Sequence, residues 1–179
     1  MNDSTAAIAD KTIVLVGLMG AGKTSVGRRL AVRLTRGFVD ADSEIESAAG
    51  MSVGDIFATH GEAHFRDGER RVIARLLDDR GQVLATGGGA FMDPETRALI
   101  KRDAVSVWLK AELDVLFCRV SRRTTRPLLN QDNPKGVLEG LMRERYPVYA
   151  GADITVTSDD IPHEAMVERI VAALAGHPS

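Results

Sequence analysis

Short apolar runs recur along the chain and alternate with longer segments of helical periodicity. The runs cover residues 12–16, 38–39, 82–86, 104–109 and 154–156. Their interiors are mainly apolar rather than alternating, which is typical of strands buried on both faces of a sheet. Strands that alternate with helices form α/β folds, so the pattern predicts a parallel sheet covered by helices on both faces.

The segments between these runs carry apolar residues every three or four positions, as amphipathic helices do. Gly50 separates two short helices, and Asp93 followed by Pro94 is a typical helix start. The expected helices cover residues 24–35, 43–49, 53–59, 62–79, 94–102, 113–120, 136–144 and 163–174. Residues 121–135 are polar and contain two prolines, so they are expected to form a loop.

Length and composition favour one soluble domain. The 179 residues suffice for a hydrophobic core, and we expect a disordered tail over residues 1–10 before a single domain over residues 11–176. A net charge of −2 and 4% aromatic residues do not suit binding to nucleic acid or to a membrane surface. Cys118 is the single cysteine, and neither a signal peptide nor a membrane-spanning run is found. We therefore expect a cytoplasmic protein.

Residues 17–24 match the phosphate-binding pattern G-x-x-x-x-G-K-[ST], between a predicted strand and a predicted helix. Backbone N–H groups of such a loop point at phosphate oxygens, and side chains would block that approach. Lys23 would reach the β- and γ-phosphates, and the Thr24 hydroxyl would bind Mg²⁺. The loop predicts a nucleoside triphosphate ligand, with these binding residues: Gly20, Ala21, Gly22, Lys23, Thr24 and Ser25.

The rest of the sequence distinguishes between classes of phosphate-loop protein. A guanine-specific GTPase needs an Asn-Lys-x-Asp stretch, which is absent from this sequence. A helicase or another motor would be larger and would carry a nucleic-acid surface. The size therefore fits a kinase that acts on a small molecule best.

Two aspartates, Asp40 and Asp42, directly follow a predicted strand. They lie at the sheet edge where ligands bind in open α/β folds. Being two residues apart, they could face a metal ion and an acceptor hydroxyl from one turn. The alternative is that one of them caps the helix expected to start at Ser43.

Glycines and arginines mark further candidate positions. Residues 87–89 are three glycines at the end of another predicted strand. Their N–H groups could contact a ligand closely, or they could form only a tight strand-to-helix connection. Arg66, Arg126 and Arg145 lie in or near expected loops, and Arg126 stands in a polar segment that could close as a lid. Taken alone, any one of these arginines fits a solvated surface residue better than a ligand contact.

Six motifs in this sequence resemble those of shikimate kinases in their order and rough spacing: GLMGAGKTSVG, FVDAD, GEAHFR, ATGGGA, RPLL and RERYPVY. The resemblance runs from about residue 12 to the end. It implies a nucleoside-monophosphate-kinase-like, three-layer P-loop fold with a five-stranded parallel sheet. It also implies Mg²⁺- and ATP-dependent phosphorylation of the 3-hydroxyl of shikimate, in the pathway to chorismate and the aromatic amino acids.

Carried onto this chain, the resemblance assigns an acceptor site. Asp42 would hold the acceptor hydroxyls and would lie where a base is needed. Arg66 and Arg145 would bind the shikimate carboxylate, with the Gly88 backbone beside the ring. The substrate-binding segment would cover residues 41–69.

The same resemblance assigns the metal site and the lid. Asp40 would order Mg²⁺, and Arg126 would reach the phosphates from a lid over residues 121–133. Lys23, the metal and Arg126 would supply positive charge to the transferred group. The residues around the adenine stay undecided between Arg122, Arg123 and Pro162.

Two other functions stay open. A gluconate kinase of the same fold would also bind a carboxylate, although the glycine triplet and two loop arginines favour a rigid carboxylated ring. A nucleotide-binding module without catalysis is disfavoured by the joint presence of Lys23, Thr24, Asp40, Asp42 and Arg126. We expect a monomer whose partners are ATP and shikimate.

Overall fold

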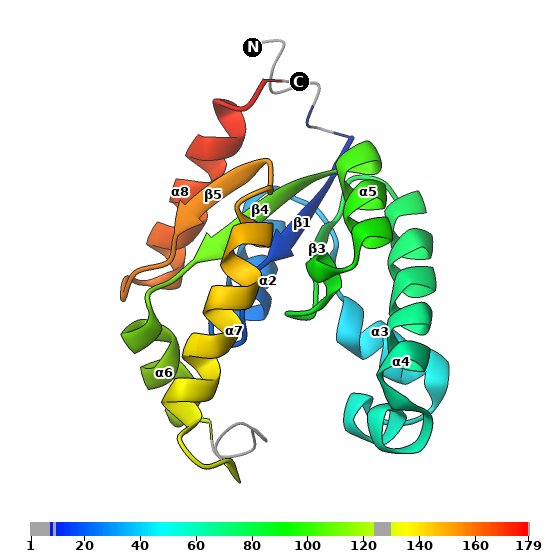
Figure 1. Ribbon diagram of the computed structural model, residues 1–179. Helices are drawn as coiled ribbons and strands as arrows, with labels where there is room; N and C mark the ends of the chain where they lie inside the picture. Colours follow the sequence, from blue (N-terminus) through cyan, green and yellow to red (C-terminus); the bar gives the residue numbers. More distant parts are fainter. Residues whose placement is uncertain (1–7, 9, 124–129, 179) are drawn as a thin grey trace.

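The computed structural model describes residue 8, residues 10–123 and residues 130–178. A parallel sheet of five strands forms its centre, in the order β2-β3-β1-β4-β5 (Figure 1). The strands are β1 (Thr12–Val16), β2 (Phe38–Asp40), β3 (Val83–Ala85), β4 (Ala104–Lys110) and β5 (Ile154–Thr157). Each strand coincides with one of the apolar runs, so the predicted sheet is confirmed.

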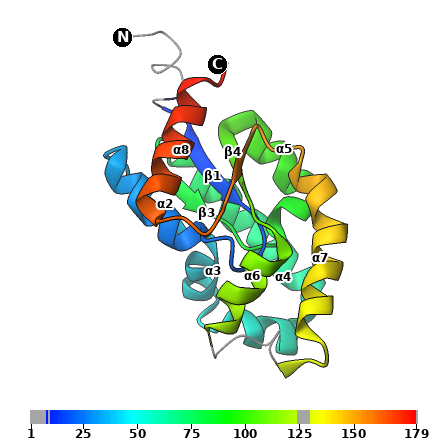
Figure 2. The same cartoon turned by 90° about the vertical axis from the view of Figure 1, so that its left-hand side faces the viewer.

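Helices cover both faces of this sheet. The helices are α2 (Lys23–Arg33), α3 (Ala41–Ala49), α4 (Val53–Asp78), α5 (Pro94–Asp103), α6 (Leu113–Ser121), α7 (Pro134–Tyr149) and α8 (His163–Ala175), with a short 3-10 turn η1 (Ala90–Met92). Helices α2 and α8 pack together on one face, while α5 and α7 lie on the other (Figure 2). The expected three-layer architecture is therefore confirmed.

Strand β1 is the most deeply buried part of the sheet. All five of its residues are buried, because it lies between β3 and β4 and is covered on both faces. This explains why its sequence is continuously apolar instead of alternating. The edge strand β5 does alternate between buried and exposed residues, as a strand with one solvent-facing side should.

The register of three neighbouring strands brings three loops to one edge of the sheet. Leu15 of β1 and Asp40 of β2 both pair with Ala85 of β3. Because these strands are parallel, the segments that follow them start side by side at their carboxyl ends. The three segments are the phosphate loop, the pair of aspartates and the glycine triplet.

Helix α7 is longer than the sequence pattern predicted. The expected helix ended at residue 144, but α7 continues through Pro147 to Tyr149. A proline inside a helix removes one hydrogen bond and costs about 3 kcal/mol. Leu138 and Tyr149 are both fully buried, one on each side of the proline, and their packing outweighs the local cost.

Two further features differ from the expected pattern. The helices expected over residues 53–59 and 62–79 form one element, α4, with a sharp break at Gly61, where φ is 82°. Ile8 lies within the tail expected over residues 1–10, yet it is 7% exposed and its carbonyl accepts a hydrogen bond from Arg36. The folded part of the chain therefore includes this residue. Among the residues described, no helix is long and apolar enough to cross a membrane.

Helix α2 packs closely against the sheet at Gly27, which is buried. A Cβ atom at this position would lie 2.7 Å from the Phe38 ring and 3.1 Å from the Leu15 side chain. Gly140 offers the opposite case, because it is exposed on α7 and a Cβ there would meet nothing within 4 Å. The packing at Gly27 thus requires a residue without a side chain, whereas the packing at Gly140 does not.

We predict that one substitution has opposite effects at these two positions. Gly27→Ala should lower the free energy of unfolding by about 1–3 kcal/mol, because the added methyl group forces α2 away from the sheet. Gly140→Ala should raise it by about 0.4–1 kcal/mol, because alanine has less conformational freedom in the unfolded chain. Urea unfolding of both variants measures the difference, and shifts of the same sign would contradict this view of Gly27.

Candidate active site

The phosphate loop ends where α2 begins. Gly22 is the residue before α2 and has a φ of 95°, a conformation that residues with a Cβ rarely adopt. The first turn of α2 contains Lys23, Thr24 and Ser25 and no acidic residue. The backbone N–H groups of this turn and the positive end of the helix dipole are therefore suited to phosphate. The Lys23 ammonium donates to the carbonyls of Gly17 at 2.6 Å and Leu18 at 3.0 Å, so it lies over this loop.

Asp40 joins the phosphate loop to α3. Its Oδ1 accepts from the N–H groups of Asp42 and Ser43, and its Oδ2 accepts from the Thr24 hydroxyl at 3.0 Å. The expectation that one aspartate caps the helix is thus confirmed for Asp40. The helix begins at Ala41 instead of Ser43, because its cap is Asp40, the last residue of β2.

The oxygens of Thr24 and Asp40 also suit a metal ion. Magnesium prefers oxygen ligands and is usually held by one or two protein groups together with water and substrate phosphates. Within the described ranges, no three His, Cys, Asp or Glu residues form a cluster that could hold a metal. This pair therefore fits a metal that arrives with a nucleotide, and does not fit a metal held by protein groups alone.

Asp42 lies in the first turn of α3 and faces the glycine triplet. A Cβ on Gly87 would be 2.9 Å from the nearer Asp42 carboxylate oxygen. Burial raises the pKa of Asp42, and the neighbouring Asp40 carboxylate raises it further. Lys23 and Arg66 oppose that rise with their positive charges. Asp42 is thus a half-buried carboxylate of increased basicity beside the phosphate loop.

Arg66 is held by a carboxylate that the sequence analysis missed. Its guanidinium donates to Glu69 at 2.7 Å, and the Glu69 side chain is 2% exposed. The other Glu69 oxygen is buried with no hydrogen-bond partner among the described residues. Burial raises the pKa of Glu69, although Arg66 opposes this effect. The three-residue spacing of an arginine and a glutamate on one helix was the available signal.

The glycine triplet, residues 87–89, brings three charged side chains together. A Cβ on the first glycine would meet Asp42, one on the second would lie 3.0 Å from Arg145 Nη1, and one on the third would lie 2.6 Å from Arg66 Cζ. None of the three glycines has a positive φ. This turn therefore requires glycine because it has no room for a Cβ atom, and not because its backbone conformation is unusual. The triplet also makes the tight connection to η1 that was the second expectation for it.

Arg119 is a second residue that the sequence analysis missed. Its guanidinium donates to the Gly20 carbonyl at 3.2 Å, to the Ser158 hydroxyl at 3.0 Å and to the Asp159 carbonyl at 2.7 Å. It therefore ties the phosphate loop to the segment after β5. Arginines are common in this chain, and no local pattern distinguished this one.

A cavity of about 450 Å³ runs over the phosphate loop, and we call it the main cavity. It contains every residue proposed for nucleotide binding within the described ranges, together with Asp40, Asp42 and Gly88. Arg122 and Arg123 also line it. Arg66 and Arg145 do not line it but contact the glycine triplet beside it. Arg126 lies outside the described residues.

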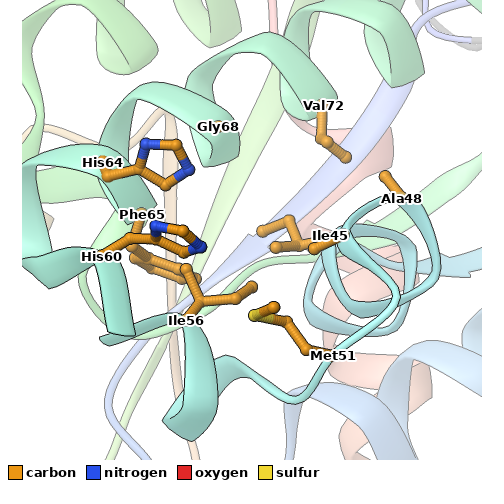
Figure 3. A pocket seen from close by; sticks show the side chains of 10 residues that line it. Ile45, Ala48, Met51, Ile56, His60, His64, Phe65, Gly68 and Val72 are labelled. Carbon is orange, nitrogen blue, oxygen red and sulfur yellow. The ribbon is translucent and has the colours of Figure 1, made fainter. Parts of the chain in front are cut away.

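A second cavity of about 260 Å³, the apolar cavity, lies between α3 and α4 (Figure 3). Its walls include Ile45, Met51 and Ile56, and the rings of His60 and His64 stack at its side with centroids 4.6 Å apart. No residue of the phosphate loop or of the glycine triplet lines it. The apolar cavity is therefore separate from the candidate site.

The main cavity joins a triphosphate-binding loop to a basic carboxylate, and charged side chains that suit a small anion lie next to it. Together with the parallel sheet, this defines the class of P-loop kinases that phosphorylate small molecules. The family model of shikimate kinase matches residues 19–175. The shikimate kinase of Rhodopseudomonas palustris is 60% identical over 169 residues, covering 94% of this chain and 83% of that protein. The chain belongs to the shikimate kinase family.

Solved structures agree with this assignment. The shikimate kinase from Acinetobacter baumannii in complex with shikimate matches with a TM-score of 0.86 and 37% identity, over 94% of each chain. A gluconokinase from Sinorhizobium meliloti matches with a TM-score of 0.63 and 18% identity, over 94% of this chain and 93% of that one. The second likeness concerns the fold alone.

We predict that a methyl group on the glycine triplet disturbs the site and spares the fold. Gly89 has ordinary helical angles, so alanine fits the backbone, but its methyl group would displace the Arg66 guanidinium. Gly89→Ala should raise the KM for the acceptor about tenfold or more, by loss of a charge-assisted contact, and should leave the melting temperature nearly unchanged.

Gly68→Ala is the matched control, because this glycine lies on α4 near Arg66 and a Cβ there would meet nothing within 4 Å. It should leave the KM for the acceptor unchanged. Steady-state kinetics on both variants measures the difference. An equal KM in the two variants would show that the Gly89 position does not constrain Arg66.

Proposed function

We infer that this chain transfers the γ-phosphate of ATP to the 3-hydroxyl of shikimate, giving shikimate 3-phosphate for chorismate and aromatic amino acid synthesis. The observation that carries this inference is the meeting of Asp42, Arg66 and Arg145 at one glycine turn. A carboxylate that can accept a proton lies there beside two cations that can bind a carboxylate. Membership of the shikimate kinase family supports the same acceptor.

The nucleotide is proposed to bind in the main cavity, with its phosphates on residues 20–25. Lys23 neutralises charge on the β- and γ-phosphates. Thr24 and Asp40 would hold Mg²⁺, which would supply positive charge and orientation to the transferred group. The main cavity extends from this loop past Arg119 to the segment after β5, which leaves room for the base at that end.

The acceptor is proposed to lie on the glycine triplet. Asp42 orients the reacting hydroxyl and accepts its proton as the bond to phosphorus forms. Arg66 and Arg145 bind the acceptor carboxylate, and two such planar groups suit bidentate contacts. The Gly88 backbone lies beside the ring. Phosphoryl transfer needs mainly positioning and charge neutralisation, which these residues supply.

The proposal also includes a substrate-binding segment, a lid, and the oligomeric state and location of the enzyme. The substrate-binding segment covers residues 41–69, and a lid over residues 121–133 closes on both ligands and brings Arg126 to the phosphates. Lid closure would exclude water and so protect ATP from hydrolysis. We also propose that the enzyme acts as a monomer in the cytoplasm.

A coupled assay of ADP release tests the function directly. The purified chain is given MgATP with shikimate, with gluconate or with no acceptor, and release should depend on shikimate. Faster release with gluconate would favour a sugar-acid kinase. Equal release in all three reactions would leave only an ATPase, and no release despite measurable ATP binding would indicate a catalytically silent module.

The two arginines generate a prediction about acceptor binding. Arg66→Ala and Arg145→Ala should each raise the KM for shikimate by about ten- to a hundredfold and leave the KM for ATP nearly unchanged, because each removes a charge-assisted contact. The methyl ester of shikimate should be a poor substrate of the unaltered enzyme for the same reason. Equal phosphorylation of ester and acid would mean that these arginines do not bind the carboxylate.

The two aspartates should fail in different ways. Asp42→Asn keeps the size of the side chain but makes a poor base, so kcat should fall about a hundredfold or more while MgATP binding stays normal. Asp40→Asn should show a defect that depends on Mg²⁺ concentration. Measurement of kcat for both variants across a Mg²⁺ titration distinguishes them. Rescue of Asp42→Asn and not of Asp40→Asn by extra Mg²⁺ would mean that the roles are reversed.

The pH dependence of kcat gives a second readout for Asp42. Asp42 must be deprotonated to accept a proton, so activity should fall as the pH drops through its pKa. Because burial raises that pKa, the loss should occur above the ordinary aspartate range of about 4. The residual activity of Asp42→Asn should lack this acidic limb.

A further inference from the structure

Tyr149, in the last turn of α7, places a hydroxyl inside the site without being exposed. The residue is fully buried, although it carries a polar group. Its hydroxyl donates a hydrogen bond to the carbonyl of Gly88, the middle residue of the glycine triplet. This buried hydroxyl can therefore hold the glycine triplet in place.

The same hydroxyl also contacts Arg145, one helical turn earlier on α7. The Arg145 guanidinium lies within hydrogen-bonding reach of the Tyr149 hydroxyl, and its positive charge opposes the rise in the pKa of Tyr149 that burial causes. Measured from a Cβ placed on Gly88, Arg145 Nη1 is 3.0 Å away and the Tyr149 hydroxyl is 3.8 Å away. The Nε of Arg145 is buried and has no hydrogen-bond partner within the described part of the chain. The Tyr149 hydroxyl is therefore an important constraint on the direction of this guanidinium.

The surroundings of Tyr149 make it a rigid support. Its ring lies among Phe91, Trp108 and Tyr146, with centroid distances of 6.4, 5.8 and 6.2 Å. Burial raises the pKa of Tyr149, although Arg145 opposes that rise. The hydroxyl consequently keeps its proton at physiological pH and can donate to the carbonyl while accepting from the arginine.

We propose that Tyr149 is a positioning residue for the acceptor. By donating to Gly88 and accepting from Arg145, its hydroxyl holds the glycine turn and the guanidinium in one arrangement, so that both meet the same acceptor molecule. This inference rests on the proposed function, because it takes the ligand of Arg145 to be the acceptor carboxylate. Without the hydroxyl, Arg145 can turn away and the Gly88 carbonyl loses its donor.

Tyr146 provides a matched control on the same helix. Its ring packs edge-on against Trp108 at a centroid distance of 4.9 Å, and its hydroxyl donates to the carbonyl of Ala111. Burial raises the pKa of Tyr146 to about 12. Replacement of either tyrosine by phenylalanine removes one hydroxyl and leaves one carbonyl without its donor. Only Tyr149 joins Arg145 to the glycine turn.

The experiment compares Tyr149→Phe with Tyr146→Phe in the full-length protein. Tyr149→Phe should raise the KM for shikimate about tenfold, as expected for loss of a hydrogen bond to a charged group. Its KM for ATP and its kcat should change less than about twofold. Tyr146→Phe should change all three values less than about twofold, while the melting temperatures of the two variants fall by similar amounts.

A double-mutant cycle with Arg145→Ala shows whether Tyr149 acts through Arg145. If it does, Tyr149→Phe should change the KM for shikimate less than about twofold when Arg145 is already alanine. Fully additive effects would overturn the proposal, as would equal changes in KM for the two phenylalanine variants. The proposed function fails separately, if the unaltered chain shows no shikimate-dependent ADP release.

Discussion

The parallel register of β1, β2 and β3 is the constraint on which the rest of this site depends. Leu15 and Asp40 both pair with Ala85, so the loops that follow β1, β2 and β3 start side by side at one edge of the sheet. The phosphate loop, the aspartates and the glycine triplet are far apart in sequence and can meet only because these strands end together. The burial of β1 makes that register costly to change, since a shift would move apolar residues out of the core.

At that edge of the sheet, the glycine triplet allows charged side chains from different elements to come into close contact. Each of its glycines leaves room for one charged side chain, and any Cβ there would occupy space now held by Asp42, Arg145 or Arg66. The charges around the triplet also balance, because two guanidinium groups lie near two carboxylates, those of Asp42 and Glu69. Burial makes both carboxylates more basic, and the neighbouring cations limit that effect.

Much of the fold followed from local sequence pattern, and the errors came from packing. The end of α7 was predicted wrongly, because the helix continues past Pro147 to Tyr149, whose side chain is buried in the core. The sequence did not decide which aspartate caps α3, and the structure assigns this role to Asp40, whose carboxylate also accepts from the Thr24 hydroxyl. Glu69 and Arg119 were missed because their importance lies in long-range or buried contacts that a sequence window does not contain.

The sequence by itself determined the order of strands and helices along the chain, the presence of the phosphate loop and the protein family. These depend on apolar periodicity, on glycine spacing and on short motifs, all of which act over a few neighbouring residues. The resemblance grouped Asp42, Arg66 and Arg145 in one acceptor site. Only the tertiary structure decided that their side chains meet at the glycine triplet, that Glu69 pairs with Arg66 and that Tyr149 contacts the triplet. The physical reason is that contact between residues so far apart depends on strand register and on the volume left by missing side chains, and neither is a property of any one segment.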